Sequence, residues 1–227
     1  MRTTNIQAIT YDAAGTLIHL AEPVGVSYST VAARHGISSV PEKLDAAFGT
    51  VWKRTPLPFD DRAPRDPNEK AWWQRVVHDV FAESGVTLPG DDAFAVFFED
   101  LYEHFETPGT WLADPDAEEV LAKTGEKYRL AVLSNFDARL RRILSDLSLL
   151  EHFEKVFLSC EIGASKPDSK IFETAARGLE LPPESILHIG DDPECDGDGS
   201  ARAGFHHFRV GNTAPPLGKL IDELSLA

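Results

Sequence analysis

Four segments of the chain carry side chains that could do chemistry together. The set combines one carboxylate that could act as a nucleophile, hydroxyl and amide donors, one cation and a cluster of acids. Its members are Asp12 and Thr16 in "ITYDAAGTLI", Ser134 and Asn135 in "RLAVLSN", Lys166 in "GASKPD", and Asp191, Asp192, Asp196 and Asp198 in "GDDPECDGDG". Carboxylates bind Mg²⁺, whereas hydroxyl groups and lysine receive the oxygens of a phosphoryl group. The set therefore indicates a site for a hard divalent metal ion and an oxyanion.

Each of these polar segments directly follows or lies close after a short apolar run that predicts a β-strand. The predicted strands cover residues 5–12, 129–135, 155–161, 185–192 and 206–211, and helical patterns such as the one over 140–147 separate them. This alternation is typical of βαβ units and predicts an α/β fold, a Rossmann-like, doubly wound parallel sheet with helices on both faces. Ligands of such a sheet bind beyond the carboxyl ends of its strands, where these side chains would meet.

A helical segment interrupts this pattern after the first strand. Between residues 18 and 106 the periodicity is helical only, and we expect its two apolar stripes to be packed core. The stripes contain Trp72, Trp73, Val76, Val77, Val80 and Phe81, and then Phe94, Phe97, Phe98, Leu101, Tyr102 and Phe105. The Pro- and Asp-rich stretch 55–69 predicts a loop between helices. We therefore expect an α/β core formed by residues 1–17 and 107–227, with an all-helical domain inserted at 18–106.

The composition limits the partners and the location of the protein. The 227 residues carry a net charge of -15, and no cluster of Lys or Arg stands out. A field of this sign disfavours nucleic acids and anionic membranes as partners. Cys160 and Cys195 are far apart, and we expect free thiols in a reducing cytoplasm. No apolar run approaches the ~18 residues of a membrane span, and we see no signal peptide, so we expect a soluble cytoplasmic monomer or homodimer.

The four polar segments resemble, in their order and spacing, the motifs of the haloacid dehalogenase (HAD) superfamily. The matching residues are Asp12-x-x-Gly15-Thr16, Ser134-Asn135, Lys166-Pro167 and Gly190-Asp191-x-x-x-x-Asp196, supported by "SKPDSKIF" at 165–172 and "ARAG" at 201–204. The helical insert resembles the C1-type cap of subfamily I. Within the superfamily, "SNFDARL", the Trp72-Trp73 pair and "CDGDG" resemble the branch named for a rhythmically expressed gene product.

The resemblance implies a role for each residue of the set. Asp12 would attack the phosphorus of a small phosphorylated metabolite and form an aspartyl-phosphate. Mg²⁺ would be held by Asp12, by the backbone carbonyl of Ala14 and by Asp191, with Asp192 or Asp196 supporting these ligands from outside. The remaining members would handle the substrate: Ser134 and Thr16 hold its phosphoryl oxygens, Asn135 contributes to binding, and Lys166 neutralises charge between nucleophile and phosphate.

Ala14 departs from the pattern of the family's phosphatases. They usually carry a second Asp at this position, which protonates the leaving group and then activates water. General acid–base catalysis is typically worth ~10²–10⁴-fold in rate. Since the expected metal ligand at this position is a backbone carbonyl, we expect metal binding to survive and ordinary phosphomonoester turnover to be poor.

Four interpretations follow from this departure. The first is a slow phosphatase-type hydrolase that uses good leaving groups such as acyl phosphates, or an acid from elsewhere such as His19 or His35. The second is phosphonate cleavage resembling phosphonoacetaldehyde hydrolases, with Lys43 or Lys53 forming a Schiff base. The third is metal-free dehalogenation, against which the Gly190-Asp191-Asp192 motif argues. The fourth is a non-catalytic binding or regulatory protein that keeps the fold.

Overall fold

The computed structural model describes residues 5–56, 69–211 and 213–226. The chain divides into two compact units, one formed by Met1–His19 with Leu112–Ala227 and the other by Leu20–Trp111. We call them the α/β unit and the helical unit. Most of the predicted loop 55–69 lies outside the described residues. The assignment of the helical unit as a C1-type cap stays a prediction.

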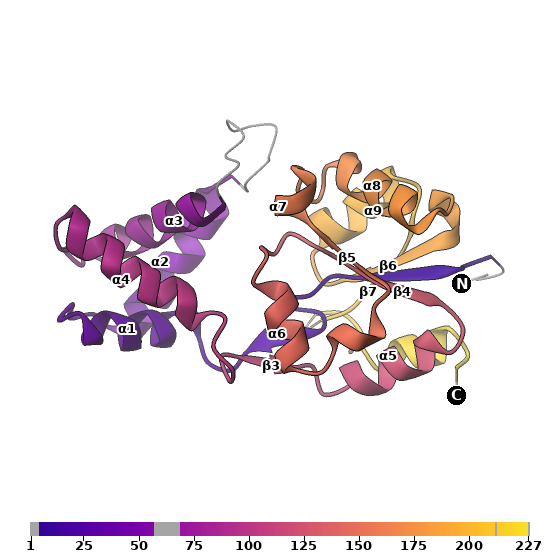
Figure 1. Ribbon diagram of the computed structural model, residues 1–227, viewed down its shortest axis with the longest axis horizontal. Helices are drawn as coiled ribbons and strands as arrows, with labels where there is room; N and C mark the ends of the chain where they lie inside the picture. The colour runs from indigo at the N-terminus through magenta and orange to yellow at the C-terminus, as the bar shows by residue number, and fades with distance from the viewer. Residues whose placement is uncertain (1–4, 57–68, 212, 227) are drawn as a thin grey trace. The chain divides into compact units, whose positions relative to one another are not determined.

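The α/β unit is built on a five-stranded sheet in the order β5-β4-β1-β6-β7 (Figure 1). All neighbouring strands are parallel, which confirms the predicted α/β class. The strands are β1 (Ala8–Tyr11), β4 (Arg129–Ser134), β5 (Lys155–Leu158), β6 (Ile186–Gly190) and β7 (His206–Arg209). Strand β1 lies between β4 and β6 and is buried at all four positions. The sheet therefore fixes the direction in which the chain continues from β1 to Asp12.

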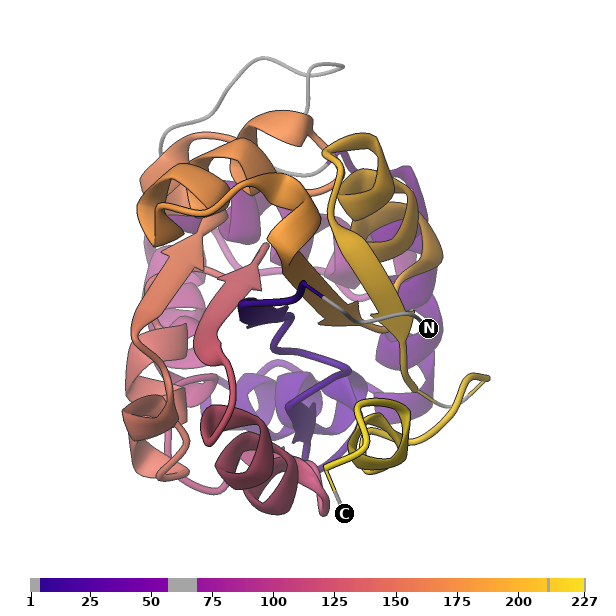
Figure 2. The ribbon, with the colours of Figure 1, turned by 90° about the vertical axis from the view of Figure 1, so that its right-hand side faces the viewer.

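Helices cover both faces of this sheet, with α8 and α9 on one side and α5 and α10 on the other (Figure 2). The helices of the unit are α5 (Ala117–Gly125), α6 (Leu140–Asp146), α7 (Ser159–Ile162), α8 (Ser169–Leu179), α9 (Gly199–Arg202) and α10 (Lys219–Glu223), with short turns η1 (Leu150–His152), η2 (Pro183–Ser185) and η3 (Pro193–Asp198). Helix α8 buries Ile171, Phe172 and Leu179 against residues of the sheet such as Leu133 and Ile186. Each such side chain contributes roughly 1.5–3 kcal/mol through burial.

All five predicted strands are longer than the strands observed, and one of them runs into a helix. The apolar pattern predicts a strand over 155–161, but β5 ends at Leu158 and the short helix α7 begins at Ser159. Gly163 closes this helix in the left-handed region (φ 69°), and its N–H donates to the Ser159 carbonyl at 2.8 Å. A glycine that adopts positive φ without steric cost favours this early turn.

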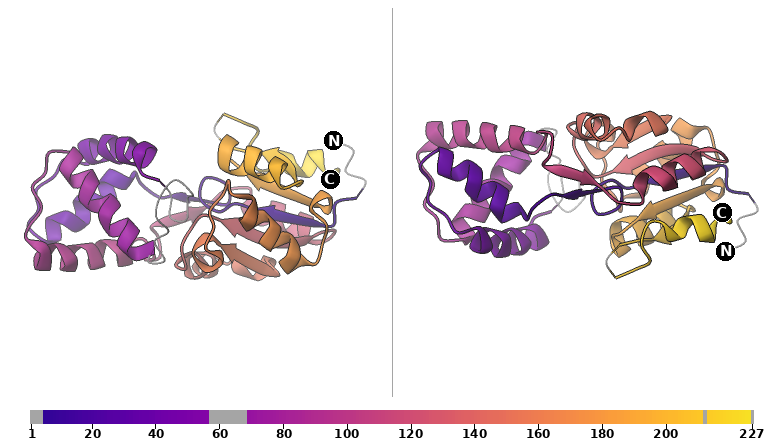
Figure 3. Two further views of the ribbon diagram at one scale, coloured as in Figure 1. Left: turned by 90° about the horizontal axis from the view of Figure 1, so that it is seen from above. Right: turned by 90° about the horizontal axis from the view of Figure 1, so that it is seen from below.

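In the described part of the helical unit, residues 20–56 and 69–111, four helices pack around their own core (Figure 3). They are α1 (Val24–Arg34), α2 (Pro41–Arg54), α3 (Glu69–Glu83) and α4 (Asp91–His104). Both predicted apolar stripes contribute to this core, with Trp72, Phe81 and Phe97 among the buried members. Gly25 lets α1 approach α2 closely, because a Cβ atom at this position would lie 2.1 Å from the Pro41 carbonyl oxygen.

Strands β2 (Ile18–Leu20) and β3 (Trp111–Ala113) form a separate two-stranded sheet, and the boundaries of the two units fall within them. Cys160 and Cys195, both within the described residues, are not joined by a disulfide bond, as predicted. Among residues 5–56, 69–211 and 213–226, no helix has the length and the apolar character that crossing a membrane requires.

Candidate active site

Asp12 stands directly after β1, at the carboxyl edge of the sheet. Its N–H donates to the Ile189 carbonyl at 2.8 Å, which ties the residue to the neighbouring strand β6. The chain then turns sharply, because the N–H groups of Leu17 and Ile18 both donate to the Ala13 carbonyl, at 2.8 and 3.0 Å. These contacts hold a nearly buried carboxylate in a defined place at the end of an apolar strand.

Gly15 brings this turn against Asp191. Its φ is 89°, and a Cβ atom at this position would lie 2.6 Å from Asp191 Oδ2. Both the backbone conformation and the close approach therefore require glycine. The segments that follow β1 and β6 thus meet at one edge of the sheet, as the positions of the polar segments predict.

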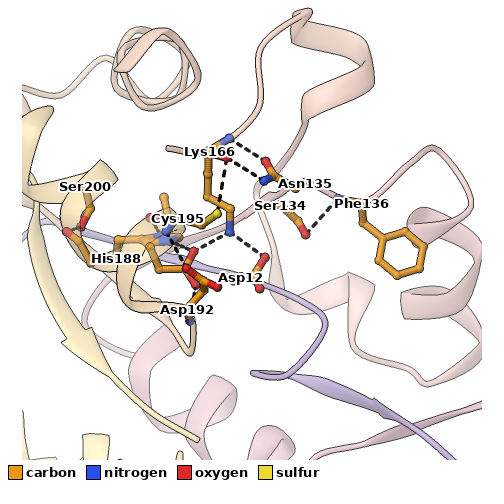
Figure 4. A network of polar contacts seen from close by, with 12 residues as sticks. Asp12, Ser134, Asn135, Phe136, Lys166, His188, Asp192, Cys195 and Ser200 are labelled. Carbon is orange, nitrogen blue, oxygen red and sulfur yellow. Dashed lines mark hydrogen bonds and ion pairs between the residues drawn. The ribbon is translucent and has the colours of Figure 1, made fainter. Parts of the chain in front are cut away.

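Lys166 forms the centre of the polar network shown in Figure 4. Its Nζ donates to Asp12 Oδ1 at 2.7 Å and to Asp196 Oδ1 at 2.6 Å, and the side chain is 2% exposed. Burial disfavours the charged amine, but the two carboxylates outweigh this effect and hold the pKa of Lys166 above its ordinary value. Lys166 is therefore a buried cation that faces Asp12.

Asn135 fixes the backbone of this lysine. Its Oδ1 accepts from the Lys166 N–H at 2.7 Å, and its Nδ2 donates to the Lys166 carbonyl at 2.9 Å. Both polar atoms of the amide are thus engaged by the chain itself. These two contacts indicate that Asn135 holds the backbone of Lys166 in position, in addition to any contact with a ligand.

Asp196 lies on η3, a π-helical turn that follows Asp192. The Asp192 side chain accepts from the N–H groups of Glu194 and Cys195 at 2.9 and 2.7 Å, which starts the turn. Asp196 folds back over Gly190, where a Cβ atom would lie 2.2 Å from the Asp196 Cγ. Burial alone would raise the pKa of Asp196, but Lys166 and His188 hold it well below its usual range.

Three carboxylates converge at this edge. One oxygen each of Asp12, Asp191 and Asp196 lies within 4.8 Å of the others. Burial, followed by the charges of Asp12 and Asp196, raises the pKa of Asp191 to about 6, and burial also raises the pKa of Asp12 despite Lys166. With one buried cation for three acids, the cluster holds unbalanced negative charge and oxygen ligands of the kind that Mg²⁺ prefers.

Two buried hydroxyl groups complete the site. Thr16 is 1% exposed, and among the described residues its Oγ1 has no hydrogen-bond partner. Ser134 is 2% exposed, and its Oγ accepts from the Phe136 N–H at 3.3 Å. A buried hydroxyl without a partner costs free energy, so Thr16 is a donor suited to a ligand oxygen.

Each of the other candidate residues is exposed or pairs with an acid. Asp192 and Asp198 are exposed, and so are Lys43 and Lys53 on α2. His19 pairs with Asp114 at 3.0 Å, and His35 pairs with Asp100 at 2.7 Å.

Sequence reasoning missed His188, a buried residue of β6 whose Nε2 lies 2.9 Å from Asp196 Oδ1. The signal was available, because a lone histidine interrupts the apolar run "SILHIG".

A five-stranded parallel sheet with carboxylates and a lysine at its carboxyl edge is the arrangement that the resemblance to the HAD superfamily implies. The family model for haloacid dehalogenase-like hydrolases matches residues 6–204, and the chain belongs to this family. The protein of Homo sapiens called haloacid dehalogenase-like hydrolase domain-containing protein 3 is 36% identical over 207 residues, which cover 90% of this chain and 82% of the relative. Rhythmically expressed gene 2 protein of Drosophila melanogaster is 30% identical over 219 residues, covering 91% and 84%. The predicted family and branch are confirmed.

Solved structures share the fold at low identity. YfnB from Bacillus subtilis, whose structure contains magnesium, has a TM-score of 0.77 at 15% identity, covering 97% of this chain and 99% of its own. A HAD phosphatase from Thermococcus onnurineus (19% identity, covering 96% and 98%) and a 2-haloacid dehalogenase from Pseudomonas syringae (20%, covering 97% and 98%) both give a TM-score of 0.65. The fold alone does not separate these two chemistries.

Replacing Asp191 by asparagine is expected to stabilise the metal-free protein at neutral pH. The folded-state pKa of about 6 lies above the ordinary value of 3.8. The stability that Asp191 contributes is therefore present below pH ~4 and lost as the pH rises through ~6. At pH 7.5, Asp191→Asn removes the repulsion between Asp191 and the carboxylates of Asp12 and Asp196. Because the side chain is partly exposed, solvent screens this repulsion, and we expect the free energy of unfolding to rise by about 1 kcal/mol.

Urea unfolding at pH 5 and 7.5 measures this change. Asp198→Asn, an exposed acid of the same loop, serves as the control and should have little effect. An equal gain in both variants would show that general surface charge, rather than the carboxylate cluster, is responsible.

Proposed function

We propose that the protein is a Mg²⁺-dependent hydrolase of phosphatase type that uses Asp12 as its nucleophile on a small phosphorylated metabolite. The observation that carries this proposal is the buried Lys166, which donates to both Asp12 and Asp196 while Asp191 stands within 4.8 Å of both carboxylates. Such a site offers a nucleophile, a cation for phosphoryl charge and ligands for a divalent metal ion.

The donor set suits Mg²⁺. Asp12, Asp191 and the backbone carbonyl of Ala14 would hold the ion, which when bound supplies positive charge toward the phosphoryl oxygens. Asp196 would support the site from outside, since its oxygens already accept from Lys166, from His188 and from the Asp192 N–H at 3.0 Å. The magnesium in the structure of YfnB is consistent with this choice of ion.

The proposed reaction has two steps. An Asp12 carboxylate oxygen attacks phosphorus, and the bond from phosphorus to the leaving oxygen breaks, so that the leaving group departs with the electron pair. Lys166, Ser134 and Thr16 donate to the phosphoryl oxygens. A water molecule then attacks the phosphorus and loses a proton to solvent, and phosphate leaves as the Asp12 carboxylate is restored.

Ala14 restricts the substrates that this site can use. It has no proton for the leaving group and cannot activate the water molecule, so the first step is slow for a poor leaving group and the second step is slow for every substrate. An acyl phosphate, whose leaving group is a stable carboxylate anion, needs no such proton. We therefore propose acyl phosphates, or other substrates with a stable leaving anion, as the favoured class.

The carboxylate cluster favours this chemistry over metal-free dehalogenation. A dehalogenase needs one aspartate and no metal ion, whereas three converging acids gain from a divalent cation. We further propose that the protein acts in the cytoplasm as a monomer or homodimer and needs neither nucleic acid nor membrane.

Hydrolysis of acetyl phosphate, p-nitrophenyl phosphate and chloroacetate, with Mg²⁺ or with a chelator, tests the proposal. We expect acetyl phosphate to be the best substrate, with loss of turnover in the chelator. Turnover that survives the chelator, or release of chloride from chloroacetate, would contradict the proposal.

A further inference from the structure

His188 lies in the middle of β6, is 0% exposed and has partners at both ring nitrogens. Its Nδ1 lies 2.9 Å from Thr10 Oγ1, and its Nε2 lies 2.9 Å from Asp196 Oδ1. Thr10 and Asp196 are themselves at most 1% exposed. A buried polar ring is costly unless it is hydrogen-bonded, and here both of its polar atoms are satisfied.

The partners define which nitrogen carries the proton. Asp196 Oδ1 also accepts from Lys166, so this carboxylate oxygen is an acceptor and His188 Nε2 donates to it. With the proton on Nε2, Nδ1 is left to accept from the Thr10 hydroxyl. The arrangement selects the tautomer with a proton on Nε2, in the same way that an outer partner orients a histidine that binds a metal ion.

The sheet itself sets this geometry. Thr10 of β1 and His188 of β6 are paired directly in the register of the two strands. Asp196, by contrast, lies on the π-helical turn η3, where its Oδ2 is held by the Asp192 N–H. His188 is therefore the link between Asp196 Oδ1 and the rigid sheet.

We infer that His188, oriented by Thr10, is a positioning residue for Asp196. It holds the Asp196 carboxylate where this group accepts a hydrogen bond from the Lys166 amino group, and this contact in turn keeps the amino group hydrogen-bonded to Asp12. This inference deepens the proposed function and rests on it for its catalytic consequence. The chain of contacts runs Thr10, His188, Asp196, Lys166, Asp12, and every separation in it is between 2.6 and 2.9 Å.

A packing role alone predicts a different response to substitution. His188 also packs edge-to-face on Phe172, with ring centroids 5.5 Å apart, and lies beside His207 at 6.4 Å. If packing were its whole role, an apolar residue of similar size would replace it without affecting Lys166. If it positions Asp196, only a side chain that keeps a donor can replace it.

The experiment compares His188→Gln, which keeps a donor, with His188→Leu and Thr10→Val. His207→Gln is the matched control, because it changes a histidine beside His188 on the neighbouring strand. Nitrogen-15 NMR of the metal-free wild type is expected to show His188 protonated at Nε2, and Thr10→Val is expected to mix the two tautomers. The Lys166 ammonium signal should persist in His188→Gln and in the control but broaden in His188→Leu.

Steady-state kinetics on acetyl phosphate provide the second readout. We expect kcat of His188→Leu to fall about 10–100-fold with KM little changed, and His188→Gln to recover most of the loss. A wild-type tautomer protonated at Nδ1, or a His188→Leu variant with unchanged Lys166 signal and kcat, would overturn the inference. If the wild type turns over no substrate, the proposed function fails, while the NMR measurements still decide the role of His188. If His188→Leu does not fold, Thr10→Val and the wild-type tautomer decide it.

Discussion

Ala14→Asp is expected to raise kcat for p-nitrophenyl phosphate about 10²–10⁴-fold, the typical value of general acid–base catalysis. The new carboxyl group would stand two residues after Asp12, where it can protonate the leaving oxygen and then activate water. The turn should survive the change, because its hydrogen bonds from Leu17 and Ile18 go to the Ala13 carbonyl and involve only the backbone. Ala14 itself is half-buried, so its side chain is not enclosed by core residues.

Ala14→Asn is the matched control, since asparagine has nearly the same size as aspartate but no carboxyl proton to transfer. It should leave kcat near the wild-type value. The gain in kcat/KM, which reports the first step, should be smaller for acetyl phosphate, whose leaving group needs no proton. An equal gain with asparagine, or no gain in an Ala14→Asp protein that folds and binds Mg²⁺, would show that proton transfer does not limit this site.

Lys166→Met is expected to lower kcat for acetyl phosphate about 10²–10³-fold, the usual cost of losing one preorganised electrostatic donor. It should also lower the free energy of unfolding by about 3–5 kcal/mol, because removing one partner of a buried ion pair leaves uncompensated charge. Here two carboxylates, those of Asp12 and Asp196, would face each other without the amine that now lies 2.7 and 2.6 Å from them.

Chemical denaturation with and without a second substitution tests the electrostatic origin of this loss. Lys166→Met combined with Asp196→Asn should recover part of the lost stability while kcat stays low. Lys123→Met, which removes an exposed pair with Glu119, should change stability little. A loss of stability that the double variant does not reduce would indicate a packing defect in place of repulsion.

Much of the site is predictable because parallel strands share one carboxyl edge. Asp12 and Lys166 are 154 residues apart, yet their side chains meet at 2.7 Å. Their types and their positions after apolar runs were enough to place them together. The same reasoning anticipated Asp196, whereas helical periodicity anticipated the core role of Trp72 and Phe97.

The features that could not be predicted depend on geometry between segments. Periodicity along one strand does not reveal that Thr10 stands opposite His188, because register is a property of two strands. The π-helical turn at Pro193–Asp198 is rare and is stabilised by the Asp192 side chain and by contact with Gly190. The early end of β5 at Leu158 likewise depends on the left-handed Gly163.

Chemical trapping of a phosphorylated Asp12 tests the central claim most directly. Because Ala14 cannot activate water, the aspartyl-phosphate should accumulate when the wild-type protein reacts with acetyl phosphate and Mg²⁺. Borohydride reduces an acyl phosphate to an alcohol, so mass spectrometry should find homoserine at position 12, less of it in Ala14→Asp and none in Asp12→Asn. Hydrolysis of acetyl phosphate without modification at residue 12, or with modification at another aspartate, would contradict the account.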